Sequence, residues 1–82
     1  MGQGQSTVKI YSTPTCPYCA MAKAFLKEHG VPFVERDVAG DKAAATEMME
    51  KSGQMAVPVL DINGEIIVGF DRDAIKKALK LP

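Results

Sequence analysis

The order of strand-like and helix-like segments constrains the fold of this chain more than any other feature. Seven segments follow one another with the patterns of strand, helix, strand, helix, strand, strand and helix. Strands joined through a helix pair in parallel, whereas a tight turn joins antiparallel strands. The sequence therefore predicts an α/β domain that contains both kinds of pairing. The predicted segments are residues 7–11, a helix from 17 to a cap at 30, and residues 33–38, 42–51, 57–62, 65–68 and 72–79.

Turn and cap residues set the boundaries of these segments. Pro17 suits the first position of a helix, where the missing N–H has no helical partner to lose. Gly30 stands where a helix commonly ends in the left-handed conformation. Asn63 and Gly64 tolerate positive φ and indicate a two-residue hairpin between two apolar runs. Asp71 is a good N-cap for the last helix.

Apolar spacing predicts which helix faces are buried. On the last helix, Ile75, Ala78 and Leu79 share one face. On the first helix, Lys23, Lys27 and Glu28 are expected opposite the buried face. That buried face is predicted to consist of Ala20, Met21, Ala24, Phe25 and Leu26.

Length and charge exclude several classes of protein. The chain has 82 residues, and a domain usually takes ~100–200 residues, so a second domain is excluded. Ten basic and ten acidic residues balance, which argues against broad binding of nucleic acid or anionic membranes. The apolar runs are too short to span a bilayer. We expect a flexible leader at residues 1–6, a single domain at 7–82, a cytoplasmic location and a monomer.

The two cysteines indicate redox chemistry. Cys16 and Cys19 are too close in sequence to stabilise the fold much as a disulfide. They lie where the first strand gives way to a helix, and the N-terminus of a helix favours an anion such as a thiolate at Cys16. Residues at positions i and i+3 of a helix lie about 5 Å apart, which a disulfide accepts. Cys16 can therefore attack a partner and Cys19 can resolve the product, with Pro17 and Tyr18 holding the turn.

A zinc site and an ordinary buried pair are the alternatives to redox chemistry at these cysteines. A Cys-x-x-Cys motif is often half of a zinc site, but His29 is the only good further ligand, and a structural site needs four. An ordinary buried pair does not account for the shaped, proline-containing loop. We expect no metal. Met48, Met49 and Met55 are expected to fill the core or to border a groove.

Three stretches together resemble glutaredoxins of the dithiol Cys-Pro-Tyr-Cys type: residues 11–19, 52–58 and 68–71. The resemblance implies a thioredoxin fold, with a four-stranded mixed sheet flanked by three helices. It implies a cis peptide before Pro58, Cys16 as nucleophile and Cys19 as resolving thiol. It also implies a site for glutathione, the co-substrate, with no tightly bound cofactor. The residues implied for that site are Thr13, Tyr18, Gln54, Val57, Pro58, Gly69, Phe70, Asp71 and Arg72.

Departures from the family pattern leave the electron donor open. Many glutaredoxins carry a basic residue where Thr13 stands, Arg where Gln54 stands, and Thr where Ala56 stands. The Gly69-Phe70 pair instead resembles redoxins that serve ribonucleotide reductase and are recharged by thioredoxin reductase. The expected partners are glutathione, disulfide-bonded or glutathionylated proteins, and either the glutathione reductase system or thioredoxin reductase. A third alternative is a dimer that carries a [2Fe–2S] cluster.

Overall fold

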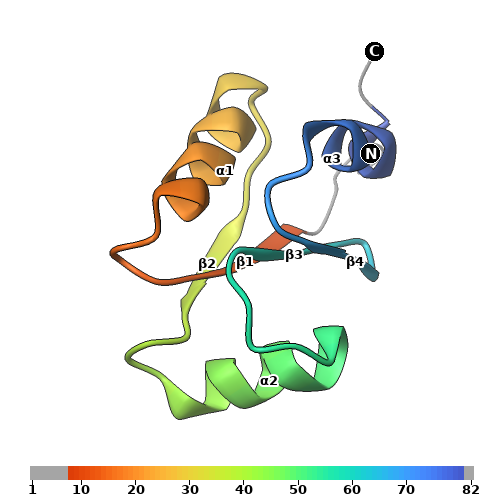
Figure 1. The fold of residues 1–82 in the computed structure, drawn as a ribbon. Coiled ribbons are helices and arrows are strands. Elements are labelled where there is room, and N and C mark those ends of the chain that lie inside the picture. Colours follow the sequence, from red (N-terminus) through yellow and green to blue (C-terminus); the bar gives the residue numbers. More distant parts are fainter. Residues whose placement is uncertain (1–7, 81–82) are drawn as a thin grey trace.

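The computed structural model describes residues 8–80, arranged in three layers (Figure 1). A four-stranded sheet forms the middle layer, helices α1 and α3 cover one face, and helix α2 covers the other. The predicted leader, Thr7 and the last two residues lie outside the described residues. The element order is the predicted one: β1 (Val8–Ser12), α1 (Pro17–Glu28), β2 (Val34–Asp37), α2 (Lys42–Ser52), β3 (Val59–Ile62), β4 (Glu65–Val68) and α3 (Arg72–Leu79).

The sheet has the strand order β2-β1-β3-β4. Strand β1 pairs in parallel with β2 and antiparallel with β3, and β3 pairs antiparallel with β4. The predicted mixture of pairings is therefore confirmed. At the β3–β4 hairpin, Asn63 and Gly64 have φ of 54° and 93°, which is the left-handed backbone that this turn requires.

Strand β1 is buried because helices cover both faces of the sheet. Its side chains alternate between two apolar clusters. Ile10 packs with Leu26 and Ile75 in the larger cluster, on the side of α1 and α3. Tyr11 packs with Met48 on the side of α2. The strand thus fixes the start of α1, and with it the cysteine motif, against a rigid core.

The predicted face of α1 was wrong in part. The buried residues of the helix are Cys19, Ala22, Phe25 and Leu26, whereas Ala20, Met21 and Ala24 are exposed. Alanines occur on both sides of this helix, and so small a side chain gives little contrast between a buried and an exposed face. The buried face of α1 therefore lies on a different side of the helix from the predicted one, and it includes Cys19.

The ends of three strands also differ from the prediction, and β1 extends to Ser12 where residue 11 was the expected end. β3 begins at Val59 and not at Val57, because Pro58 has no N–H to donate to a ladder. β2 is shorter by one residue at each end, and it has only β1 as a neighbour. The caps agree with the prediction: Gly30 has φ of 67°, and Asp71 caps α3 by accepting from the Ala74 N–H at 3.2 Å.

A charge network covers Tyr11 on the α2 side of the sheet. Glu47 accepts from Lys9 at 3.3 Å and pairs with Arg36 at 3.3 Å and Lys51 at 3.4 Å. The Tyr11 hydroxyl is buried among these groups and shifts the pKa of Glu47 and Lys51, although it forms no hydrogen bond of good geometry. Helix α2 is thus held to the sheet by ion pairs as well as by apolar packing.

Candidate active site

The cysteine motif lies at the junction of β1 and α1. Cys16 is the N-cap of α1, in extended conformation, and Pro17 occupies the first turn, as predicted. The Cys16 Sγ accepts a hydrogen bond from the Cys19 N–H at 3.3 Å. A side chain that accepts from an N–H of the first turn is the usual geometry of an N-cap, and here the acceptor is a sulfur. The helix therefore presents a partial positive charge to the Cys16 sulfur.

The two thiols differ in access to solvent. Cys16 is half-buried, whereas Cys19 is 0% exposed, and both are free. Burial raises the pKa of Cys19 to about 11, and the neighbouring Cys16 thiol acts in the same direction. The Thr13 backbone and the Lys23 ammonium act in the opposite direction, lowering that pKa. An incoming disulfide can therefore reach Cys16 and not Cys19.

The loop that precedes β3 faces the cysteines across the end of the sheet. The Cys16 Sγ lies 4.0 Å from the carbonyl oxygen of Val57, which is 41 residues away in sequence. The Val57–Pro58 peptide bond is cis, as the resemblance implied. The Gly69 N–H donates to the carbonyl oxygen of Pro58 at 2.7 Å. This bond joins the loop before β3 to the turn before α3, beside the reactive sulfur.

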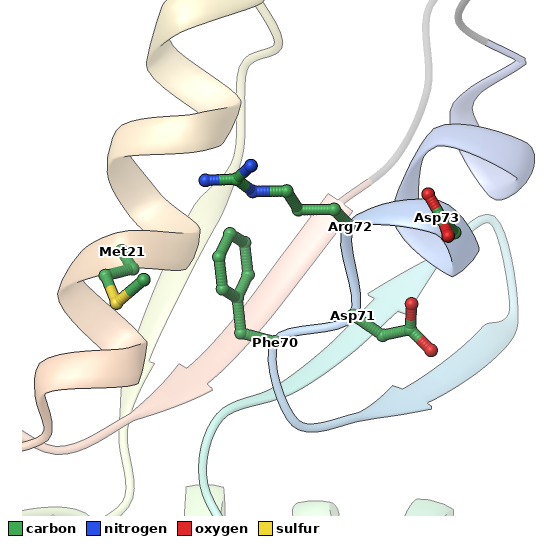
Figure 2. Close-up of a pocket in the computed structure, with 5 residues that line it drawn as sticks. All are labelled: Met21, Phe70, Asp71, Arg72 and Asp73. Atoms are coloured by element: carbon green, nitrogen blue, oxygen red, sulfur yellow. The ribbon is translucent and has the colours of Figure 1, made fainter.

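An open hollow of about 600 Å³ lies between α1 and the start of α3. Figure 2 shows the Arg72 side chain reaching across Phe70 toward α1, where Met21 faces the ring. The Arg72 guanidinium carbon lies 5.7 Å from the centre of the Phe70 ring, a distance at which a cation and a ring attract. Asp71 and Asp73 line the side away from α1. The hollow therefore combines an apolar wall with one cation and two carboxylates.

The structure brings together most of the residues predicted for the site. Cys16 and Val57 are in contact, Gly69 joins them through Pro58, and the hollow gathers Phe70, Asp71 and Arg72. The remaining three predicted residues, Thr13, Tyr18 and Gln54, are not part of this set of contacts.

Thr13, Tyr18 and Gln54 make no side-chain contact with the Cys16 sulfur among the hydrogen bonds of the described residues. Thr13 precedes the motif in sequence, and its carbonyl oxygen accepts from the Cys16 N–H at 3.4 Å. Tyr18 is exposed on the first turn of α1. Gln54 is exposed too, and its backbone N–H donates to the Ser52 hydroxyl at 3.1 Å, within the turn after α2.

The sequence patterns did not predict the roles of two residues near the site. Met21 was predicted to be buried, but it is 45% exposed and lines the hollow. Lys23 was assigned to a solvated face, but it forms an ion pair of 2.7 Å with Glu35. The spacing of apolar residues along the sequence does not indicate either role, because both roles depend on which face α1 turns toward its neighbours.

The other groups that the sequence singled out lie elsewhere. The His29 ring packs on the Phe25 ring at 4.4 Å between centroids. Met48 is in the core, whereas Met49 and Met55 are exposed and line a separate hollow of about 240 Å³. Within residues 8–80, no cluster of three or more His, Cys, Asp or Glu side chains is placed to hold a metal ion. Across the same residues, no helix is both long and apolar enough to cross a membrane.

Known proteins resemble this chain in sequence and in fold. The glutaredoxin family model matches residues 8–67. The chain is 47% identical to a glutaredoxin-like 8.6 kDa protein of the rubredoxin operon in Clostridium pasteurianum, over 89% of this chain and 97% of that one. It is 42% identical to glutaredoxin 3 of Escherichia coli, over 80% of each chain.

Solved structures of similar fold indicate the same family as these relatives do. The glutaredoxin of Archaeoglobus fulgidus superposes with a TM-score of 0.84 at 26% identity, over 95% of this chain and 90% of that one. A thioredoxin-like protein, crystallised as a single-residue variant, gives a TM-score of 0.87 at 31% identity, over 92% and 96% of the two chains. The chain therefore belongs to the glutaredoxin family, within the thioredoxin-fold superfamily, and is a glutaredoxin-like thiol oxidoreductase.

Proposed function

We propose that this protein reduces protein disulfides or glutathionylated proteins through the Cys16/Cys19 dithiol and is itself reduced by glutathione. The Cys16 thiolate attacks one sulfur of the substrate disulfide, and the other substrate sulfur leaves as a thiolate that takes up a proton. Cys19 then attacks the Cys16 sulfur, so that the substrate is released and the protein becomes a disulfide. Two molecules of glutathione restore the dithiol and become glutathione disulfide.

The single observation that carries this proposal is the unequal environment of the two sulfurs. Cys16 is accessible at a helix N-terminus, whereas Cys19 is fully buried, with its pKa raised to about 11. Reactive cysteines occupy accessible sites that stabilise the thiolate, and buried thiols in apolar surroundings react slowly. These environments favour Cys16 as the thiol that attacks and Cys19 as the thiol that resolves.

Glutathione is an extended tripeptide with two carboxylates, and the surroundings of Cys16 suit such a ligand. The backbone of Val57 precedes strand β3 and can pair with the peptide as an added strand would. The turn Gly69-Phe70-Asp71 leads into α3, whose N-terminus offers N–H groups to a carboxylate, and Arg72 adds a charge. We propose that Thr13, Tyr18, Gln54 and Pro58 border the same groove.

A second electron donor, thioredoxin reductase, is favoured by the character of the hollow. Met21 and Phe70 form an apolar wall, and Arg72 is the single cation among the five residues that line it. Neither Thr13 nor Gln54 supplies a charge for a carboxylate of glutathione. Met, aromatic and Arg side chains are enriched at protein–protein interfaces, and the carboxylates of Asp71 and Asp73 in the hollow oppose a small anion. With either donor, we propose that the protein acts as a monomer in the cytoplasm.

The rate at which each system reduces the oxidised protein decides between the two donors. NADPH consumption is measured with glutathione plus glutathione reductase, and in parallel with thioredoxin reductase alone. We expect the glutathione system to be faster. Arg72→Ala should raise the KM for glutathione about ten- to a hundredfold and leave kcat unchanged, because a charge-assisted hydrogen bond contributes about 1.5–3 kcal/mol.

The control for this experiment is Lys77→Ala, which removes an exposed cation from the same helix. Its KM for glutathione should equal that of the parent. Faster reduction by thioredoxin reductase, together with a KM for glutathione that does not respond to Arg72→Ala, would replace glutathione with the second donor.

A further inference from the structure

We propose that Lys23 is a positioning residue for the second step of the cycle: its ammonium group, held by Glu35 and Ser12, favours the thiolate of Cys19 as Cys19 attacks the mixed disulfide at Cys16. This inference rests on the proposed dithiol cycle and assigns a role to a residue outside the cysteine motif.

A chain of contacts holds Lys23 in place. Lys23 follows Cys19 by four residues on α1, so the two side chains lie on the same side of the helix. The Lys23 side chain is only 25% exposed. Its Nζ donates to Glu35 Oε2 at 2.7 Å, and the Ser12 hydroxyl donates to the same oxygen at 3.1 Å. Ser12 is 1% exposed at the end of β1. Two strands of the sheet therefore anchor this ammonium group.

The need for such a cation follows from the burial of Cys19. A thiol attacks as its thiolate, and burial raises the pKa of Cys19 to about 11. In the mixed disulfide Cys16 carries no negative charge and does not oppose ionisation of Cys19. Burial still opposes this ionisation, and the Lys23 ammonium group favours it. The Thr13 backbone lowers the Cys19 pKa, and the charge of Lys23 acts in the same direction. Glu35 stays a carboxylate that can hold the ammonium group, since the hydrogen bonds from Lys23 and Ser12 keep the pKa of Glu35 below its usual value.

The step itself balances without another reagent. The Cys19 thiol gives up its proton and its sulfur forms a bond to the Cys16 sulfur. The bond between Cys16 and the substrate sulfur breaks, and the leaving thiolate takes up a proton from solvent. Lys23 stays protonated throughout and contributes only the field of its charge.

A two-phase reaction separates the role of Lys23 from that of Cys16. The reduced protein is mixed with one equivalent of dithionitrobenzoate, an aromatic disulfide whose released thiolate is coloured. The first release reports attack by Cys16, and the second reports attack by Cys19. Lys23→Met should lower the thiolate fraction of Cys19 and slow the second phase. A loss of thiolate of about tenfold gives a phase about threefold slower, because roughly half of the loss, on a logarithmic scale, is offset by the greater nucleophilicity of the thiolate. The pH midpoint of that phase should rise, and the first phase should be unchanged.

Two matched variants accompany this test. Lys23→Arg keeps the charge and should restore the second phase, and Lys27→Met removes an exposed cation one turn later and should change neither phase. Equal slowing of both phases by Lys23→Met, or no slowing of the second, would overturn the inference. If the parent itself shows a single release, the proposed dithiol cycle fails, which is a different result.

Discussion

Cys16→Ser is expected to abolish thiol–disulfide exchange, whereas Cys19→Ser should still attack disulfides and should accumulate as a mixed disulfide with its substrate. The accessible sulfur at the N-terminus of α1 performs the first attack, and the fully buried one can reach only Cys16. Without Cys19 the protein has no thiol to release the trapped substrate. Incubation with a disulfide-bonded protein and a mass measurement under non-reducing conditions detects the trapped species.

The double variant Cys16→Ser/Cys19→Ser serves as the background for that measurement. Its mass should be unchanged, because the sequence has two cysteines and this variant replaces both. Trapping by Cys16→Ser and not by Cys19→Ser would reverse the assigned roles.

Glu47→Gln is expected to lower the free energy of unfolding at pH 7 by about 1–2 kcal/mol. The Tyr11 hydroxyl, Lys9 and Lys51 lower the pKa of Glu47 from 4.5 to about 2. A shift of one unit corresponds to about 1.4 kcal/mol, and the value is reduced here because the side chain is 26% exposed and solvent screens its pairs. Glutamine keeps the shape of the side chain and removes its charge.

The pH dependence of the free energy of unfolding shows whether the charge of Glu47 causes the loss of stability in Glu47→Gln. A carboxylate with a lower pKa in the folded protein stabilises the fold above its unfolded pKa. For Glu47 this stability disappears as pH falls from about 4.5 toward 2. The difference between parent and Glu47→Gln in urea unfolding should therefore narrow over that interval. Glu50→Gln, an exposed change on the same helix, should have little effect at any pH. A difference for Glu47→Gln that is the same at pH 7 and pH 2 would point to packing instead of charge.

Local sequence signals were sufficient for the order of the elements and for their turns. Asn63-Gly64, Gly30 and Asp71 each specify a backbone conformation through their own chemistry, and the structure has those conformations. The position of Cys16 at the start of α1 follows from Pro17 in the same way. These features depend on neighbours in the chain, which is why they could be predicted.

Features that depend on long-range packing could not be predicted from such signals. The rotation of α1, which exposes Met21 and buries Ala22, is decided by the sheet beneath it. The approach of Val57 to Cys16 joins residues 41 positions apart, and only the resemblance to glutaredoxins indicated it. The pairing of Lys23 with Glu35 required both the rotation of α1 and the register of β2.

Limited alkylation of the reduced protein tests the central assignment most directly. The protein is treated with substoichiometric iodoacetamide at pH 7, and the modified cysteine is identified by peptide mass mapping. We expect the label on Cys16, because it is accessible at a helix N-terminus, while Cys19 is 0% exposed with its pKa raised to about 11. A label that appears first on Cys19 would contradict the account.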